Sequence, residues 1–233
     1  MLSIENLTVT YGEQEVLRQL STRFEYNEIH GIVGMNGAGK TTLFNTLYGF
    51  KKAQNGRILL DGAVLDSRQI AFLETRNYFY PYLHGREYLQ LLSLGKQDFD
   101  INEWNRLFDL PLDTPVDQYS TGMKKKLAFM GMLALDRPIV ILDEPFNGVD
   151  VESNEKIRQI LERIRSPKRI ILLSSHIMGS LTGVCDRISY LTKGEMSRTF
   201  LQKDFGQLEE MLQELIRQQI EGTLDDLFGK IAV

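Results

Sequence analysis

Residues 34–41 read GMNGAGKT, and this stretch decides how the rest of the chain is interpreted. An apolar run at residues 29–33 precedes it and predicts a buried strand, while residues 42–48 predict a helix. Glycines let successive backbone N–H groups face a polyphosphate, and the N-terminus of the following helix adds partial positive charge. Lys40 would then reach the β- and γ-phosphates, and the Thr41 hydroxyl would bind Mg²⁺. A chance glycine-rich turn is the alternative, but the strand and helix on either side favour phosphate binding.

The composition is that of one large domain with a buried core, at 233 residues. A formal net charge of −4 and an isoelectric point near 5.5 give no general basic character, so composition does not support a nucleic-acid partner. Cys185 is the single cysteine, so we expect a small buried apolar residue, no intrachain disulfide and, with an N-terminus unlike a signal peptide, a reducing cytoplasm. No run approaches ~18 apolar residues, so any membrane role would come through a partner.

The N-terminal region predicts strands. Residues 2–10 and 16–24 mix β-branched and polar residues on either side of a turn, which is typical of an antiparallel pair. Tyr11 lies in that turn, where its ring would either stack on a purine base or be an ordinary surface residue. Residues 57–60 and 70–73 predict two further short strands.

Residues 76–135 have a different character, because strand patterns give way to helical ones. A cluster of aromatic residues around Pro81 opens this segment. Near its end, Ser120 is suited to be the N-cap of a helix whose N–H groups would face a ligand. Taken alone, STGM would only cap a helix, and the lysines at 124–126 are typical of a solvated face. We therefore expect an inserted helical subdomain.

The apolar run at residues 138–142 predicts a buried parallel strand that ends in Asp143 and Glu144. Two acids at the carboxyl end of a central strand would face the crevice where open α/β sheets bind ligands, unless they only cap the next loop. Because adjacent strand residues point to opposite sides, Asp143 would serve Mg²⁺ and Glu144 a water molecule. His176 follows the next predicted strand, at 169–173, and could donate to a γ-phosphate, although a lone histidine is more often structural.

The C-terminal region predicts a hairpin and a helical tail. Residues 188–191 and 195–200 form the hairpin, and the apolar spacing at 208–216 predicts an amphipathic helix. A capping-box pattern at 223–226 predicts a final short helix. We expect this tail to pack on its own domain rather than on another chain.

With these pieces in order, the chain resembles the nucleotide-binding subunit of an ATP-binding cassette (ABC) transporter from Leu2 to about Phe200. Six motifs match in the family's order: Tyr11 as the adenine-stacking aromatic, 34–41 as Walker A, 120–123 (STGM, commonly SGGQ) as the signature, 139–144 as Walker B, 147–150 as the D-loop and His176 as the switch histidine. The wording TGMKKKL and the closing TLDDLF also resemble bacterial exporters whose ATPase and membrane subunits are separate chains. Their cargo is drugs, antimicrobial peptides or cell-envelope components.

The resemblance implies an α/β fold. It would have a P-loop NTPase core with a mixed, largely parallel sheet and flanking helices, N-terminal antiparallel β strands and an inserted α-helical subdomain. We expect a single nucleotide-binding domain over residues 1–233. Its core would lie at 1–75 and 136–200, its helical subdomain at 76–135 and its helical tail at 201–233.

The resemblance also implies the site residues and the cofactors, ATP and Mg²⁺. Lys40, Glu144 and His176 would be catalytic, with Glu144 as the general base or the group that orients water. Thr41, Asp143 and Thr75 would hold the metal. The ATP-binding residues would be Tyr11, Asn36, Gly37, Ala38, Gly39, Lys40, Thr41 and Thr42, joined from a second chain by Ser120, Gly122 and Asp150.

One position departs from the family pattern. Aligning IAFLETRNYFYP places Thr75 where the family has a glutamine that contacts Mg²⁺ and the attacking water. Threonine is shorter and still offers one oxygen, whereas the neighbouring Glu74 could substitute only after a shift of the backbone. The departure affects two expectations, the set of ligands around Mg²⁺ and the coupling of ATP hydrolysis to the membrane partner.

The implied function is an ATP-hydrolysing subunit that powers a membrane ABC transporter, an exporter, through ATP-driven closure of a dimer. Its partners would be a polytopic transmembrane permease, docked near the aromatic residues after Thr75, and a second ABC ATPase chain in a homodimer, with no nucleic acid. It would be cytoplasmic, at the inner face of the cell membrane through the permease. Two alternatives stay open: a cytosolic ABC ATPase acting on an assembly, ribosomes or nucleic acid, and a regulatory module that binds ATP without hydrolysing it.

Overall fold

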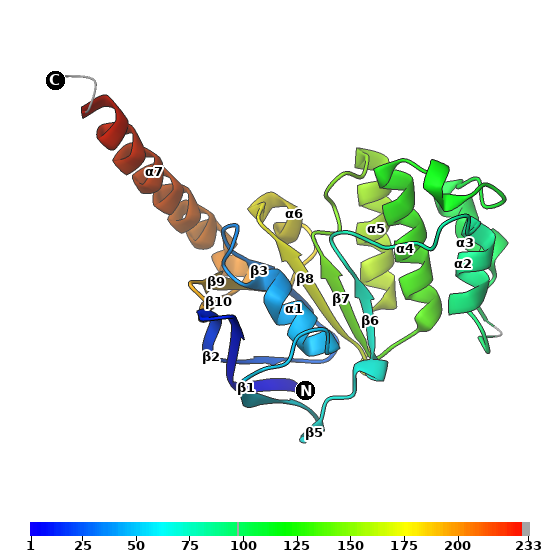
Figure 1. Cartoon of the computed structure of the whole chain (residues 1–233), viewed down its shortest axis with the longest axis horizontal. Helices are drawn as coiled ribbons and strands as arrows, with labels where there is room; N and C mark the ends of the chain where they lie inside the picture. The colour runs from blue at the N-terminus through cyan, green and yellow to red at the C-terminus, as the bar shows by residue number, and fades with distance from the viewer. Residues whose placement is uncertain (97, 230–233) are drawn as a thin grey trace.

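The computed structural model describes residues 1–96 and 98–229 and contains two β-sheets (Figure 1). The smaller sheet comes from the N-terminal part of the chain, with strand order β2-β1-β4-β5. β1 pairs antiparallel with both β2 and β4, which confirms the predicted antiparallel pair. The strands are β1 (Leu2–Tyr11), β2 (Gln14–Phe24), β4 (Asn55–Leu60) and β5 (Ala63–Val64).

The larger sheet has the strand order β10-β9-β3-β8-β7-β6 and is parallel except for the β9–β10 hairpin. Strands β3, β7 and β8 are buried over their whole length, and a strand with both faces covered has no reason to alternate apolar and polar residues. The mixed, largely parallel sheet is thereby confirmed. Its strands are β3 (Ile29–Val33), β6 (Ile70–Leu73), β7 (Ile139–Asp143), β8 (Ile170–Ser175), β9 (Arg187–Thr192) and β10 (Glu195–Leu201).

Helices cover both faces of the larger sheet. Helix α1 (Lys40–Tyr48) lies between the two sheets, where Leu43 and Phe44 are fully buried. The other face packs on α4 and α5 through Phe129 and Leu161. Helices α2 and α3 lie beyond α4 (Figure 1). The bounds are α2 (Gly85–Leu92), α3 (Ile101–Phe108), α4 (Thr121–Leu135), α5 (Val151–Ile164) and α6 (Met178–Thr182), with 3₁₀ turns at Ser67–Gln69, Val116–Gln118 and Gln202–Asp204.

The parallel arrangement brings four chain segments to one edge of the sheet. Strands β3, β6, β7 and β8 run in the same direction, so the residues that follow them leave the sheet on the same side. These are the glycine-rich loop, the segment at Thr75, the Asp143–Glu144 pair and the segment at His176. Segments far apart in the sequence thus meet at the carboxyl ends of the strands.

The C-terminal helix differs from its prediction. Helix α7 (Phe205–Gly229) is continuous, so the separate short helix predicted from residues 223–226 is wrong. Thr223 would have to leave helical geometry to act as a cap, whereas the apolar repeat of Ile220 and Leu224 continues through it. Phe205 and Leu208 are buried and anchor the base of α7 on the domain, but the rest of the helix extends away from the body (Figure 1). The prediction that the tail packs on its own domain therefore holds only for the base of α7.

None of the helices formed by residues 1–96 and 98–229 is both long and apolar enough to cross a bilayer.

Gly56 offers a test of the pairing between β1 and β4. Its φ is +98°, and an added Cβ would lie 2.6 Å from the carbonyl oxygens of Glu5 and Asn6. Gly62 has a similar φ of +83° with nothing within 4 Å of an added Cβ. Both substitutions to alanine therefore strain the backbone, by about 1–2 kcal/mol, but only Gly56→Ala also pushes two strands apart.

We expect Gly56→Ala to lower the midpoint of thermal unfolding by several degrees more than Gly62→Ala, because about 1 kcal/mol shifts a domain of this size by roughly 2–4 °C. Circular dichroism melting curves measure the difference. Equal midpoints would contradict the close approach of β4 to β1.

Candidate functional site

The glycine-rich loop between β3 and α1 needs its glycines for two different reasons. Gly37 and Gly39 have φ of +80° and +110°, which residues with a Cβ rarely adopt. At Gly34 the constraint is space, because an added Cβ would lie 2.3 Å from the Leu191 carbonyl oxygen. The loop therefore wraps tightly around the start of α1, with Gly39 as the residue before its first turn.

Lys40 lies inside this loop and is 7% exposed. Its Nζ donates to the carbonyl oxygens of Gly34 at 2.7 Å and Met35 at 3.4 Å. Burial lowers the pKa of Lys40, and the negative charges of Glu144 and Asp143 oppose that shift. An ammonium group held against the backbone of a glycine-rich loop in this way is suited to receive an anion.

Asp143 is the meeting point of three hydroxyl groups. Thr41 and Thr75 each donate to its Oδ2 at 2.7 Å, and Ser174 donates to its Oδ1. Asp143 is 1% exposed, so these hydroxyls offset the cost of burying the carboxylate. Thr75 thus lies beside Thr41 and Asp143, and the three predicted metal ligands gather at one point.

Glu144 leaves the strand direction and begins a turn, with φ of +52°. The prediction that strand alternation separates Asp143 from Glu144 is therefore wrong in its cause, because Asp143 ends β7 and the turn redirects Glu144. Oε1 of Glu144 lies 2.8 Å from Nδ1 of His176, and Oε2 accepts from Asn147 at 3.1 Å. Two neighbours thus fix the orientation of a carboxylate that is 9% exposed.

A cavity of about 480 Å³ joins these groups. It brings together the glycine-rich loop, Thr75, Glu144 and His176 as predicted, and adds Gln14, Val16 and Asn147. No local pattern predicts Gln14 and Val16 as lining residues, because their position depends on how β2 folds over the loop. Tyr11 does not line the cavity; it is 47% exposed, with Lys51 Nζ 4.1 Å from its ring centre. The lining residues are Gln14, Val16, Asn36, Gly37, Ala38, Gly39, Lys40, Thr41, Thr42, Thr75, Glu144, Asn147 and His176.

Ser120, Gly122 and Asp150 form a separate surface and do not line that cavity. Ser120 is exposed and caps α4 by accepting from Met123 N at 3.2 Å, as predicted. Asp150 caps α5; the Ser153 backbone N–H, the Ser153 hydroxyl and the Lys126 charge hold its pKa down at about 2. An added Cβ at Gly122 would lie 2.9 Å from the Gly148 carbonyl oxygen, so the starts of α4 and α5 lie close together.

Lys125 was not predicted as a site residue, and the expectation that 124–126 form a solvated face is wrong for it. It is 5% exposed, and its Nζ donates to the carbonyl oxygens of Glu144 at 2.5 Å and Asn147 at 3.1 Å. Burial lowers its pKa, opposed by the charges of Glu144 and Asp143. Three consecutive helical residues span about 200° of a helix surface, so in a helix covered on most sides one of them has to point inward.

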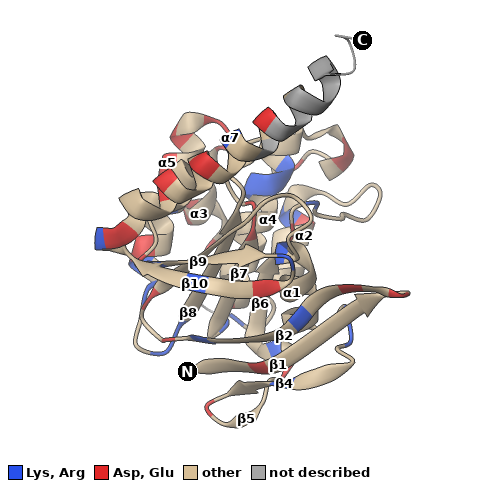
Figure 2. Cartoon of the chain, turned by 90° about the vertical axis from the view of Figure 1, so that its left-hand side faces the viewer, with Lys and Arg blue, Asp and Glu red and all other residues tan. Residues whose placement is uncertain are grey.

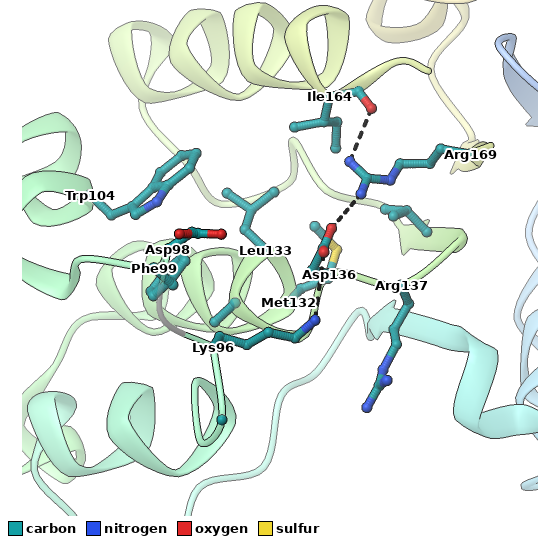
Figure 3. Close-up of a pocket in the computed structure, with 13 residues that line it drawn as sticks. Lys96, Asp98, Phe99, Trp104, Met132, Leu133, Asp136, Arg137, Ile164 and Arg169 are labelled. Carbon is teal, nitrogen blue, oxygen red and sulfur yellow. Dashed lines mark hydrogen bonds and ion pairs between the residues drawn. The ribbon is translucent and has the colours of Figure 1, made fainter. Parts of the chain in front are cut away.

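A second cavity, of about 460 Å³, lies at the opposite edge of the sheet, where β7 and β8 begin (Figure 3). Phe99 and Trp104 stack on one side of it. Asp136 pairs with Lys96 at 3.6 Å and with Arg169 at 2.5 Å, so these charged groups are matched with each other. None of the predicted site residues lines this cavity.

Comparisons with known proteins agree on one family. A family model described as ABC transporter matches residues 17–147. An uncharacterized ABC transporter ATP-binding protein of Synechocystis is 34% identical over 78% of this chain, which spans 55% of that relative. The lantibiotic transport ATP-binding protein SrtF of Streptococcus pyogenes is 30% identical over 94% of this chain and 97% of its own length. A solved ATP binding subunit of an ABC transporter aligns with a TM-score of 0.75 at 27% identity, covering 93% of this chain and 99% of its own.

Lys125→Met tests whether the buried ammonium holds the turn after β7. The variant leaves two carbonyl oxygens without their donor and removes a positive charge from beside Asp143 and Glu144, so we expect a loss of about 1–3 kcal/mol in unfolding free energy. Lys124→Met is the matched control, because Lys124 Nζ makes only a 3.5 Å contact at the surface. Urea unfolding measures both, and equal stability of the two variants would contradict the assignment.

Proposed function

Because the chain belongs to the ABC transporter family, whose model spans more than half of it, we propose that it is the subunit that drives a membrane exporter by hydrolysing ATP. As a member of this family the chain binds ATP and is an ATPase. The observation that carries the proposal is the single cavity in which the glycine-rich loop, Lys40, Glu144 and His176 meet.

The phosphates would bind in the glycine-rich loop. Gly37 has open space where a side chain would be, so a phosphate can approach the backbone N–H groups there. Lys40 Nζ, now hydrogen-bonded to loop carbonyls, would turn to the β- and γ-phosphates, whose charge it neutralises. Asn36, Ala38, Gly39, Thr41 and Thr42 complete this cradle.

The oxygen atoms around Asp143 fit Mg²⁺. No group of three or more His, Cys, Asp or Glu side chains with metal-binding geometry occurs among the described residues, but Mg²⁺ in phosphate-transfer sites needs few protein ligands. Thr41 and Thr75 place hydroxyl oxygens 2.7 Å from the Asp143 carboxylate, a hard-oxygen set that suits this ion. Thr41, Asp143 and Thr75 would hold the metal, which when bound would neutralise phosphate charge.

Glu144 would orient the attacking water and accept its proton. Its carboxylate borders the cavity and is fixed by His176 and Asn147. If His176 Nδ1–H donates to Glu144, Nε2 can donate to a γ-phosphate only when the ring is protonated. His176 would thus position the base and stabilise the phosphate.

A second copy of the chain would complete the site. The surface of Ser120, Gly122 and Asp150 lies outside the cavity of its own chain, which supports a role for these residues at the ATP of another copy. Closure of a homodimer would place each ATP between the glycine-rich loop of one chain and the start of α4 of the other. Tyr11, exposed at the end of β1, would then stack on the adenine.

The membrane partner would be a polytopic permease that holds the chain at the inner face of the cell membrane. Tyr78, Tyr80 and Tyr82 are 70–82% exposed and form an aromatic surface suited to docking. Phe79 is not part of it, because it packs on Tyr88 with ring centres 5.0 Å apart. Two observations support an exporter of drugs, antimicrobial peptides or envelope components. One is the relative named for lantibiotic transport, and the other is the TGMKKKL and TLDDLF sequences of this chain.

Glu144→Gln tests the role of the carboxylate. We expect ATP to bind with near-normal affinity and turnover to fall ~10²–10⁴-fold, the usual loss when a general base is removed. Glu155→Gln is the control, since Glu155 lies on the exposed side of α5. Phosphate release and a nucleotide-binding titration measure the two quantities, and near-normal turnover would refute the assignment of Glu144.

Mixing two inactive variants tests whether the site is shared between chains. Homodimers of Glu144→Gln or of Ser120→Arg carry two defective sites each. In a mixed dimer one site collects both lesions, while the other joins an intact Glu144 to an intact Ser120. We expect the mixture, or better a tethered pair, to regain measurable ATPase activity. If the two halves of the tethered pair still associate with ATP but the pair is inactive, both sites must be intact for hydrolysis. A pair that is inactive and whose halves do not associate with ATP would contradict the shared site.

A further inference from the structure

The outer part of α7 carries an apolar ridge that nothing in the described chain covers. Beyond its buried base, α7 leaves the body of the molecule (Figure 1). At 25 residues and about 1.5 Å per residue, the helix is about 37 Å long. It is therefore an arm that reaches well beyond the domain.

The ridge follows one regular spacing. Leu208 and Leu212 are buried at the base, and Ile216, Ile220 and Leu224 continue the same step of four residues outward. These three outer side chains are 41%, 53% and 44% exposed, and Leu215 beside them is 41% exposed. A step of four residues forms the ridges by which one helix packs into the groove of another. Its continuation past the body indicates a helical partner rather than a role in this domain's core.

The charge along the arm narrows the choice of partner. Residues 209–221 contain Glu209, Glu210, Glu214 and Glu221 against Arg217 alone, and red ribbon segments, which mark acidic residues, are spaced along the described part of α7 in Figure 2. An anionic lipid surface attracts helices rich in Lys and Arg, so this helix is unsuited to it. A second copy of the arm would bring like charges together.

The complementary partner is basic. Cytoplasmic segments of polytopic membrane proteins carry an excess of Lys and Arg near the ends of their membrane helices. We propose that the outer part of α7 docks on a basic helix, apolar on one face, at the cytoplasmic side of the membrane permease, with Ile216, Ile220 and Leu224 in its groove. This rests on the proposed function, because it supplies the permease with a second contact, separate from the tyrosine surface.

Co-purification tests the docking. The full chain, tagged, would be co-expressed with a polytopic membrane protein from a neighbouring gene and extracted in detergent. Ile216→Gln with Ile220→Gln removes two of the three outer apolar side chains of the ridge but keeps good helix formers, and we expect at least tenfold less permease to be retained. Gln207→Ala with Gln218→Ala changes the opposite side of α7 and should retain wild-type amounts. Basal ATPase activity and thermal unfolding of the purified chain should be unchanged in both variants.

A charge variant tests the basic character of the partner. Glu210→Gln, Glu214→Gln and Glu221→Gln together should weaken retention at low salt and flatten its dependence on NaCl concentration. An unchanged salt dependence would contradict a basic partner.

The outcomes separate the two proposals. Retention of the Ile216→Gln, Ile220→Gln variant at wild-type level would overturn the docking alone. If the wild-type chain itself fails to co-purify, the proposed function falls, and the docking with it. Light scattering of the isolated chain and sedimentation with phosphatidylglycerol vesicles test the other occupants: a nucleotide-free dimer or vesicle binding that the ridge variant abolishes would overturn the permease as partner.

Discussion

The rest of the site depends on one buried carboxylate. Asp143 ends β7 at 1% exposure and accepts hydrogen bonds from Thr41, Thr75 and Ser174, which come from three different segments. Hydrogen bonds to a charged group contribute roughly 1.5–3 kcal/mol each, whereas an unpaired buried carboxylate is strongly unfavourable. The charge therefore pins the glycine-rich loop, the end of β6 and the end of β8 to one point.

Charge balance extends this constraint to the next residue. Asp143 and Glu144 are both nearly buried, and so are Lys40 and Lys125, each below 10% exposed. The two lysines belong to different helices, α1 and α4. Burial lowers the pKa of both, and the negative charges of the two carboxylates oppose this shift. Four charges that would each be unfavourable alone thus stabilise one another. Lys125 adds a further constraint, because its ammonium binds the carbonyl oxygens of the turn that aims Glu144.

Sequence patterns predicted the parts of this arrangement that depend on local chemistry. The glycine-rich loop, the apolar run before Asp143 and the Ser120 cap each follow from rules about neighbouring residues. They did not reveal Lys125, which looks like one lysine in a solvated run until the covered sides of α4 are known. The positive φ of Glu144 and the position of Val16 in the cavity depend on contacts between distant segments. The capping pattern at residues 223–226 wrongly predicts a break in α7, because the apolar repeat continues through it.

The position of α4 links the two halves of the site. Its N-cap, Ser120, lies on the exposed surface, while Lys125, little more than one turn along the same helix, holds the backbone of Glu144 inside the molecule. A helix is stiff over one turn because each backbone hydrogen bond spans four residues. A displacement of the start of α4 would therefore act on the carbonyl oxygens of Glu144 and Asn147, and through that turn on the carboxylate beside His176. Lys125, whose charge balances the buried carboxylates, thus links the exposed surface at Ser120 to the orientation of Glu144.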